Sequence, residues 1–385
     1  MKPRILFMID SLPGGGAEKV LIYILNQIDR SKFDVDLLLI NKLGIYLSSI
    51  PSDINCFAVF GDGQKMKSIG LYPLFRLYRR IGTILFRKYP ALISKFIKLK
   101  HDYDIGISFC QGDNTVLLRE KKNCFRSRVS WIHTDMTKRL SSEKEFPFWK
   151  GLSDIDGFFF VSQEAESVYL SFFPDNEQLK QKTRILYNPI DSITIRDQAQ
   201  QASEMNKNNS LRIVAVGLLS HSKRFDRLIN IHKRLLDDGI MQEVYILGEG
   251  MFRKELEIQI KELGVEDSCR LMGFQNPYPY INAADIFVSS SEQEGMPLVV
   301  AEAMVLCKPI VSTSITGPTE MLEDGKYGLL TENNEEALFQ GIKKMLTDKN
   351  LREHYINELK NNQNKFIFNS SVENIENALI DIINK

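Results

Sequence analysis

The sequence predicts an α/β protein built from two doubly wound, Rossmann-like domains. The chain has 385 residues, which is too long for one ordinary core and fits two domains of roughly 150 to 200 residues each. Short apolar runs alternate with segments whose apolar residues recur at helical spacing, as in parallel strands joined by helices. A polar stretch near the middle, RDQAQQASEMNKNNS, has almost nothing to bury and separates two such alternations.

The first domain is expected over residues 1–190. It opens with the apolar run ILFMI, a glycine turn at residues 14–16, the helical pattern AEKVLIYILNQI and a second strand at residues 33–40. This order is a βαβ unit, which implies a parallel sheet. Further strands are expected at DIGISF, VSWIH, GFFFVS and RILYNP.

A polar linker is expected over residues 191–210, followed by a second domain over residues 211–365. Its strands are expected at RIVAVG, EVYILG, CRLMGF, DIFVSS, PIVSTS and YGLLT, with helices between them. Residues 366–385 predict a C-terminal helix that could return to the first domain. Ligands of doubly wound sheets bind beyond the carboxyl ends of the strands, so we expect the site in a cleft between two facing domains.

Composition excludes several classes of protein. Acidic and basic residues are equal in number, so the formal net charge is zero and no nucleic-acid partner is indicated. The five cysteines are scattered without a C-x-x-C pair, which argues against a disulfide framework and a zinc site and favours a reducing cytoplasm. The apolar run after MKPR is too short for a signal peptide, and no stretch of 18 apolar residues predicts a spanning helix.

A basic amphipathic stretch lies between Asp62 and Asp102, where no acidic residue occurs. Lysines and arginines there are interleaved with leucine, isoleucine and phenylalanine, a pattern typical of a helix that lies on an anionic membrane surface. The candidates for facing the membrane are Arg79, Arg80, Arg87 and Lys88. The sequence therefore predicts peripheral association with the inner face of the membrane; a solvated basic face packed on the sheet is the alternative.

The stretch VGLLSHSKRFDRLI, residues 216–229, has the layout of a phosphate site. A strand ends, a short loop carries Ser220, Lys223 and Arg224, and a helix begins near Phe225. Two cations beside a helix N-terminus suit a diphosphate, because the helix dipole favours anions and the side chains add charge-assisted hydrogen bonds. An exposed basic loop is the alternative.

The stretch SSSEQEGMPLVVAEAM, residues 289–304, places Glu294 just before an apolar helix and Glu302 inside it. Because a buried, unpaired carboxylate is unfavourable, Glu302 must lie at an exposed edge or have a dedicated partner. The amides around Gly295, Met296, Pro297 and Leu298 could hold phosphate oxygens at the helix start. A nucleotide sugar has ribose hydroxyls on one side of its diphosphate and sugar hydroxyls on the other, and a carboxylate can accept hydrogen bonds from each. Glu302 would then bind the ribose and Glu294 the sugar. The alternative is a structural role for both acids: the helix dipole would favour Glu294 at the helix start, and Glu302 would be paired in the interior.

These stretches together resemble the retaining glycosyltransferases of family 4, which have the GT-B fold. The E-x7-E spacing from Glu294 to Glu302 resembles the hallmark of that family. GGGAEKV, VGLLSHSKRFDRLI, LMGFQNPYPYINAADIFVSS and PIVSTSITGPTEMLEDGKYGLLT extend the resemblance almost continuously over the second domain and in patches over the first.

The resemblance implies roles for individual residues. Lys223 matches the lysine that binds the donor diphosphate, Glu302 the acid on the ribose and Glu294 the acid on the donor sugar. Gly15 and Gly16 match the loop that faces the donor phosphates or the acceptor. His133, in SWIHTD, matches a histidine beside the transferred sugar, and its neighbour Asp135 could orient it; a lone histidine after a strand is otherwise more often structural.

The sequence departs from the family pattern at two places. Leu218 stands where the family usually has an arginine, so Arg224 could supply that charge. Met296 and Pro297 stand where many members have an aromatic residue and a glycine, which bears on the identity of the donor sugar and not on the fold.

The resemblance implies transfer of a hexose or N-acetylhexosamine from a nucleotide-diphosphate sugar to a glycan or lipid-linked glycan in bacterial surface polysaccharide biosynthesis. UDP is preferred as the donor nucleotide and GDP is possible. No cofactor or metal is expected. Three D-x-D spacings occur, at Asp34 with Asp36, Asp102 with Asp104 and Asp154 with Asp156, but each lies at or before the start of a candidate strand, away from the expected cleft.

Three rival functions are open from the sequence. A nicotinamide-dependent oxidoreductase is disfavoured, because Lys19 stands where G-x-G-x-x-G needs its third glycine. A nucleotide-sugar epimerase or a sugar phosphorylase could use the same fold, although neither needs the basic amphipathic stretch. A non-catalytic, glycan-binding scaffold is the third, since fold alone does not determine function.

Overall fold

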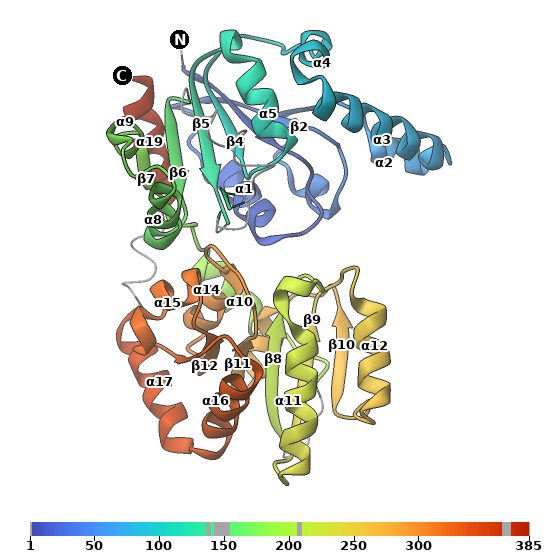
Figure 1. Cartoon of the computed structure of the whole chain (residues 1–385), viewed down its shortest axis with the longest axis vertical. Helices are drawn as coiled ribbons and strands as arrows, with labels where there is room; N and C mark the ends of the chain where they lie inside the picture. Colours follow the sequence, from blue (N-terminus) through green and yellow to red (C-terminus); the bar gives the residue numbers. More distant parts are fainter. Residues whose placement is uncertain are drawn as a thin grey trace. The chain divides into compact units, whose positions relative to one another are not determined.

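The computed structural model describes residues 2–134, 136, 140, 141, 155–205, 210–363 and 371–384. Two compact units divide the chain: unit 1 comprises Met1–Pro189 and Ser370–Lys385, and unit 2 comprises Ile190–Asn369. Each unit is a parallel sheet flanked by helices (Figure 1). The predicted α/β class with two doubly wound domains is thus confirmed.

Unit 1 contains a seven-stranded parallel sheet in the order β3-β2-β1-β4-β5-β6-β7. Its strands are β1 Arg4–Ile9, β2 Asp34–Leu39, β3 Asn55–Ala58, β4 Tyr103–Phe109, β5 Phe125–Ile132, β6 Gly157–Phe160 and β7 Thr183–Ile185. The central strands β1, β4 and β5 are buried over their carboxyl-terminal parts, which explains the apolar runs there. The order reverses between β1 and β4, so the crevice for a ligand lies at their carboxyl ends.

The helices of unit 1 are α1 Gly16–Gln27, α2 Gly63–Ser68, α3 Tyr72–Lys88, α4 Pro90–Phe96, α5 Asp113–Glu120, α8 Gln163–Ser171, α9 Glu177–Lys180 and α19 Val372–Ile383. The C-terminal helix α19 belongs to this unit. Its buried Glu376 accepts hydrogen bonds from the Asp29 amide at 2.7 Å and from the Lys32 ammonium at 2.6 Å. These bonds tie the end of the chain to the turn before β2.

Unit 2 contains a six-stranded parallel sheet in the order β10-β9-β8-β11-β12-β13. Its strands are β8 Leu211–Val216, β9 Gln242–Leu247, β10 Cys269–Gly273, β11 Ile286–Ser289, β12 Ile310–Thr313 and β13 Leu329–Thr331. The order reverses between β8 and β11, which pair directly. A ligand crevice is therefore expected at the carboxyl ends of these two strands.

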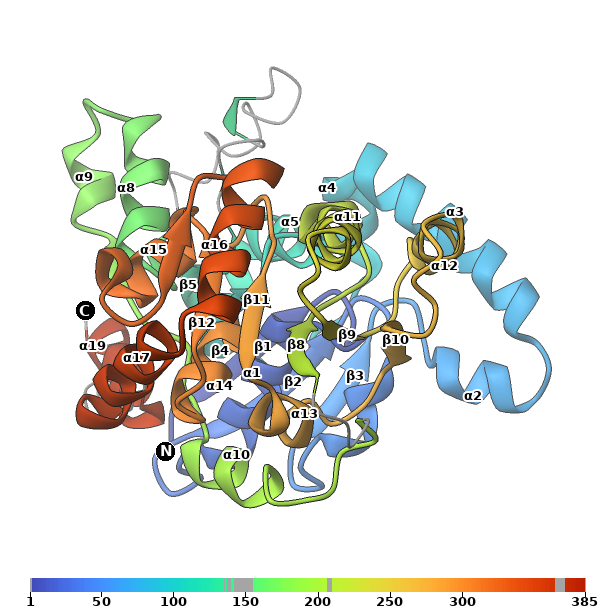
Figure 2. The same ribbon diagram turned by 90° about the horizontal axis from the view of Figure 1, so that it is seen from below.

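The helices of unit 2 are α10 Ser192–Gln198, α11 Phe225–Asp237, α12 Arg253–Glu262, α13 Tyr278–Ala283, α14 Leu298–Val305, α15 Thr316–Met321, α16 Glu335–Thr347 and α17 Lys349–Asn361. Figure 2 shows α11, α12 and α16 on one face of the sheet and α10, α13 and α14 on the other. Each face has its own apolar core cluster.

The expected polar linker over residues 191–210 is wrong in its first part. Residues Ser192–Gln198 form α10, in which Ile195 is buried. Ile195 and Ala199 pack with Tyr278 and Val305 in a small apolar cluster of unit 2. The correction has a simple cause: two apolar residues one turn apart suffice to dock a short helix, even in a segment that is polar overall.

All five cysteines are free thiols. Within the described ranges, no helix is long and apolar enough to cross a membrane. The D-x-D pairs at Asp34 with Asp36 and Asp102 with Asp104 lie at the starts of β2 and β4, the edge opposite the carboxyl ends; Asp154 of the third pair lies outside the described residues.

Candidate functional site

The loop after β8 shapes the position of Lys223. His221–Lys223 form a single 3-10 turn, and Arg224 adopts the left-handed conformation (φ 51°, ψ 40°) directly before α11. The stem of Lys223 lies across Gly217, where a Cβ would come within 3.3 Å of its Cδ and Cε atoms. Glycine at the strand end thus leaves space for the lysine stem, so that the ammonium group can reach the neighbouring strand.

The loop after β11 brings Glu294 to Lys223. The ammonium group of Lys223 donates to Oε1 of Glu294 in an ion pair, and the Ser291 hydroxyl donates to the same oxygen at 2.7 Å. The Lys223 and Glu294 side chains are only 20% and 15% exposed. Two residues 71 positions apart in the sequence therefore meet at the carboxyl ends of β8 and β11, where the strand order reverses.

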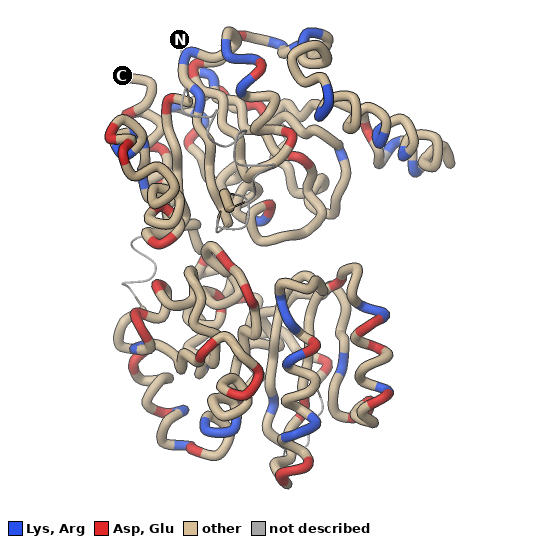
Figure 3. The backbone as a smooth tube through the Cα atoms, viewed as in Figure 1, with Lys and Arg blue, Asp and Glu red and all other residues tan. Residues whose placement is uncertain are grey.

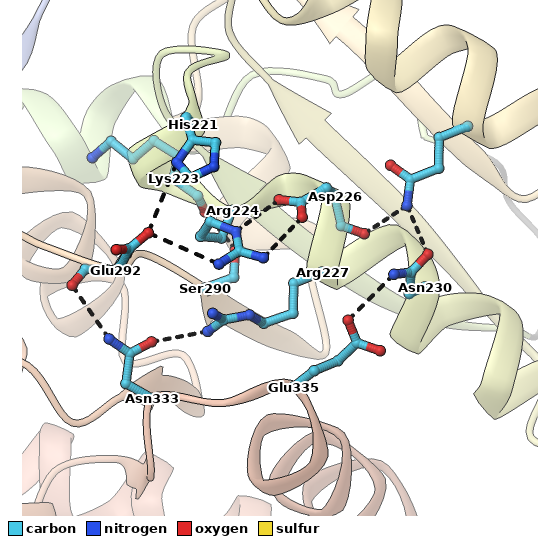
Figure 4. A network of polar contacts seen from close by, with 11 residues as sticks. His221, Lys223, Arg224, Asp226, Arg227, Asn230, Ser290, Glu292, Asn333 and Glu335 are labelled. Atoms are coloured by element: carbon cyan, nitrogen blue, oxygen red, sulfur yellow. Dashed lines mark hydrogen bonds and ion pairs between the residues drawn. The ribbon is translucent and has the colours of Figure 1, made fainter.

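The side chain of Arg224 pairs with acids other than Glu294 (Figure 4). Its Nε and one terminal nitrogen donate to the two carboxylate oxygens of Asp226 at 3.1 and 3.0 Å, and Glu292 lies 3.8 Å away. The hydrogen bond with Asp226 raises the pKa of Arg224 further. Asp226 and Glu292 hold the guanidinium group of Arg224, whereas the ammonium group of Lys223 lies at Glu294, shortly before the start of α14. This position favours Lys223 over Arg224 as the phosphate-binding cation.

The same network connects the loops after β8 and β11 to the segment that follows β13. Arg227 donates to the side-chain oxygen of Asn333 at 2.9 Å, and Asn230 donates to Glu335 at 3.2 Å. Asn333 in turn donates to the backbone oxygen of Glu292 at 3.3 Å (Figure 4). The segment after β13 thereby braces both loops that carry the Lys223–Glu294 pair.

The segment from Gly295 to Leu298 begins α14. Pro297 is its N-cap, with extended backbone angles, and Leu298 is the first helical residue, one position after the expected start. This segment packs closely on the start of α15, since a Cβ at Gly317 would lie 2.3 Å from the backbone oxygen of Gly295. The first turn of a helix leaves amide groups without intrahelical partners, which suits an anion.

Glu302 is buried, with 3% exposure, on the inner side of α14. The hydroxyl of Tyr278, on α13, donates to Oε1 of Glu302 at 3.5 Å. Of the two alternatives for this acid, the structure shows a partner and not an exposed edge. Glu302 lies about 7.5 Å along the helix from Pro297, on the scale of the separation between a diphosphate and a ribose ring.

His133 follows β5 in unit 1 and is only 9% exposed. Its ring centroid lies 4.4 Å from that of Phe109 and 5.6 Å from that of Trp131. Burial lowers the pKa of His133 to about 3, so the imidazole is neutral near pH 7. Its Nε2 has no hydrogen-bond partner among the described residues, whereas Asp135, named as its possible orienting group, lies outside them.

Gly15 and Gly16 form the turn between β1 and α1. Gly14 has φ 123°, and Gly15 is the N-cap of α1. A Cβ at Gly15 would lie 2.3 Å from a carboxylate oxygen of Glu18, so Glu18 covers this turn closely. The turn lies at the carboxyl end of β1, beside the strand reversal of unit 1.

Two groups of residues at these edges were not predicted from the sequence. Asp10, directly after β1, accepts from the amides of Asp113 and Asn114 at 3.3 and 3.0 Å, and burial raises the pKa of its carboxyl group.

Leu218, Met251 and Phe274 follow β8, β9 and β10 and are 59%, 89% and 57% exposed. Their position in the loops that follow strands was the available signal, because residues there face the ligand crevice of a doubly wound sheet.

The four membrane-facing candidates differ in their surroundings. Arg80 and Lys88 are exposed, and Arg79 is half-buried. Arg87 is 66% exposed but also pairs with the buried Asp113, with Nε and Oδ1 2.7 Å apart. Arg79 and Arg87 therefore face unit 1 in part, and only the other two are surface cations alone.

Comparisons with known proteins identify the family. Residues 196–383 match the model of the family described as glycosyl transferases group 1. The chain is 30% identical, over 93% of its length and 94% of the relative, to the N-acetylgalactosamine-N,N'-diacetylbacillosaminyl-diphospho-undecaprenol 4-alpha-N-acetylgalactosaminyltransferase of Campylobacter jejuni.

Solved structures show the same fold. HepE of Anabaena, in complex with UDP and glucose, has a TM-score of 0.74 at 20% identity, with both chains fully covered. A point mutant of S. aureus TarM, in complex with fondaparinux, alpha-GlcNAc-glycerol and UDP, has a TM-score of 0.73 at 14% identity, again with full coverage. From the full-length relative and the family match, this chain belongs to the group 1 glycosyltransferases, on a GT-B fold.

Proposed function

We propose that this glycosyltransferase moves a hexose or N-acetylhexosamine, with retention of configuration, from a UDP-sugar to a hydroxyl group of a lipid-linked glycan. The observation that carries the proposal is the meeting of Lys223 and Glu294 at the strand reversal of unit 2, with the buried Glu302 on α14, the helix that follows Glu294. The name of the Campylobacter relative, which acts on a diphospho-undecaprenol-linked sugar, supports a lipid-linked acceptor. The match of 36% of the chain to a lipopolysaccharide core biosynthesis glycosyltransferase of Rhizobium meliloti supports a role in bacterial surface glycan synthesis. UDP in the HepE and TarM complexes supports the donor nucleotide over GDP.

In this proposal the Lys223–Glu294 ion pair opens when the donor binds. The diphosphate competes for the ammonium group of Lys223, with two negative charges and several acceptor oxygens against the single carboxylate. Glu294 is then free to accept hydrogen bonds from the sugar hydroxyls, and the amides at the start of α14 hold phosphate oxygens. Ser220, in the loop after β8 with Lys223, and Glu302, on the ribose hydroxyls, complete the donor set.

An apolar surface is available for the uracil ring. Leu218 and Met251 lie on loops that are tied together, since the Leu219 amide donates to the Glu249 oxygen at 2.9 Å and the Phe252 amide to the Leu219 oxygen at 3.1 Å. Phe274 follows Gly273, which bridges to Gly248 on the same edge. Exposed apolar side chains beside a phosphate site can stack or cover a base.

Transfer itself would depend mainly on electrostatic stabilisation. The bond between the anomeric carbon and the phosphate oxygen breaks, and the acceptor oxygen attacks the same face of the sugar. Its proton passes to the departing phosphate oxygen. Lys223 and the α14 amides stabilise the negative charge that develops on the diphosphate. His133, Gly15 and Gly16 are assigned to the sugar and acceptor side, where a neutral imidazole can hydrogen-bond a hydroxyl without repelling a developing positive charge.

The test is a transfer assay with the purified protein. UDP-N-acetylgalactosamine, UDP-N-acetylglucosamine and UDP-glucose are each incubated with a short glycan on a polyprenyl diphosphate. Mass spectrometry detects the extended glycan, and NMR of the product gives the anomeric configuration. We expect one donor to give an α-linked product. A β-linked product would contradict retention, and binding of UDP without any product would favour the non-catalytic scaffold.

We expect transfer to need no divalent metal. The positive charges of Lys223 and of the helix start would supply the stabilisation that a metal ion gives in other glycosyltransferases. In the same assay, excess EDTA should leave the initial rate unchanged. Loss of activity in EDTA that returns on addition of Mg²⁺ or Mn²⁺ would contradict this part of the proposal.

A lipid-linked acceptor resides in a membrane, so the enzyme must reach the membrane surface. We propose that the protein associates peripherally with the anionic inner face of the membrane. The basic, acid-free stretch from residue 63 to residue 101 supports this association. It predicts salt-sensitive binding to anionic lipid, whatever the donor sugar.

A further inference from the structure

Residues 63–96, which form α2, α3 and α4, are called the arm. The arm projects from the side of unit 1 (Figure 1). Its inner side is already packed: Phe75 and Phe86 are buried, and a Cβ at Gly82 would lie 2.6 Å from the ring of Phe60. The attachment of the arm to the unit is therefore complete without its outer face.

The outer face of α3 carries an apolar stripe that is exposed to solvent. Its members recur at helical spacing and are 41% to 67% exposed: Leu74, Leu77, Tyr78, Ile81, Ile84 and Leu85. They occupy an arc about 120° wide at about 100° per residue. On α4 the exposed apolar surface continues at Leu92 and Phe96, which are 54% and 76% exposed.

An exposed surface of this kind marks an interaction site, because monomeric soluble proteins rarely expose large contiguous apolar patches. The charges beside it indicate the partner. Arg76 and Arg80 are exposed and lie about 40° apart on the helical wheel, next to the stripe, whereas Arg87, at a similar angle, pairs with Asp113 of the unit. Lysines and arginines recur along the whole arm (Figure 3), and no acidic residue occurs from residue 63 to residue 101. An exposed apolar face with arginines along one side, Lys88 at its C-terminal end and no acidic residue nearby in the sequence is complementary to anionic lipid headgroups over an apolar interior.

We propose that the stripe inserts into the membrane, so that α3 lies in the interface with its apolar side chains below the lipid phosphates and the arginines at their level. This deepens the proposed function, since a lipid-linked acceptor resides in such a membrane. It differs from adsorption by the basic residues alone. Insertion buries apolar surface and therefore persists at high salt, whereas attraction between charges is largely screened there.

A matched pair of variants separates insertion from a general change in surface polarity. The first variant is Ile81→Ser with Ile84→Ser, on the stripe, where these side chains are 49% and 55% exposed. The control is Ile193→Ser with Ile258→Ser, on α10 and α12, where they are 73% and 56% exposed. Both variants remove the same atoms from exposed helix positions. Circular dichroism and thermal unfolding confirm that each remains folded.

Binding is measured by cosedimentation with vesicles of phosphatidylglycerol and phosphatidylethanolamine, at 0.1 M and 1 M NaCl. The wild type and the control should bind alike and keep part of their binding at 1 M NaCl. The affinity of the stripe variant for the vesicles should be at least roughly tenfold lower than that of the wild type at both salt concentrations. Equal binding of the stripe variant and the wild type would overturn insertion.

A competing occupant of the stripe is a second copy of the chain. Sedimentation velocity without lipid tests it: a wild-type dimer that the stripe variant reduces to a monomer would overturn the membrane assignment. Neither measurement requires transfer activity. A protein that binds vesicles as predicted but transfers no sugar would contradict the proposed function alone.

Discussion

Replacing Lys223 by alanine should lower the rate of sugar transfer roughly 10²–10³-fold, the effect of removing one preorganised group that stabilises a developing charge. UDP affinity should fall about 10- to 100-fold, because a hydrogen bond to a charged group is lost. The reason lies in the position of Lys223: its ammonium group reaches the carboxyl ends of β8 and β11, where a diphosphate would sit at the start of α14.

The control for this variant is Lys233→Ala, on α11 of the same unit. Lys233 pairs with Asp237 on the same helix and is 38% exposed, so its removal deletes an equal charge away from the site. UDP affinity of the control should match the wild type. If Lys223→Ala bound UDP as tightly as the wild type, the phosphate assignment would be wrong.

Replacing Glu294 by glutamine should separate binding from transfer. In the free protein Glu294 holds Lys223, so the neutral variant no longer competes with the diphosphate, and UDP should bind as tightly as in the wild type or up to a few-fold more tightly. Transfer should fall roughly 10²–10³-fold, because the carboxylate no longer orients the sugar or faces the positive charge that develops at the anomeric carbon.

The control for this variant is Glu292→Gln, two residues earlier. Glu292 faces Arg224 and His221, each 3.8 Å away, and lies outside the proposed sugar contacts. Its transfer rate should stay within a few-fold of the wild type. Weaker UDP binding by Glu294→Gln would show that Glu294 contacts the nucleotide and not the sugar.

The sequence predicted most strands of both sheets because they are buried on both faces and read as continuous apolar runs. The strand β3 escaped prediction. It lies at the edge of the sheet of unit 1, all four of its residues are only half-buried, and its sequence NCFA has neither a long apolar run nor an alternation. Edge strands carry a weaker signal because less of their surface is buried.

The sequence also placed Lys223 and Glu294 at strand ends of one sheet, and the structure brings them together. It could not show that Arg224 turns away from them. That direction depends on the left-handed backbone at Arg224 and on Asp226 and Glu292, together with Asn333 from a loop more than 100 residues later. The binding roles of Lys223, Glu294, Glu302 and His133 stay predictions.

The basic stretch illustrates what a pattern can and cannot specify. Charge and apolar spacing predicted an amphipathic helix, but an apolar face can pack on a sheet or stay exposed, and both give the same sequence pattern. The structure shows both in one helix: Phe75 and Phe86 face unit 1, while Leu77 and Ile81 face solvent.

In the proposed function, unit 2 binds the diphosphate and ribose of a UDP-sugar through Lys223 and Glu302. Calorimetric titration of UDP, GDP and NAD into the wild-type protein tests this binding. We expect micromolar binding of UDP, weaker binding of GDP and no detectable binding of NAD. Absence of UDP binding by a protein shown to be folded, or preferential binding of NAD, would contradict the proposed function.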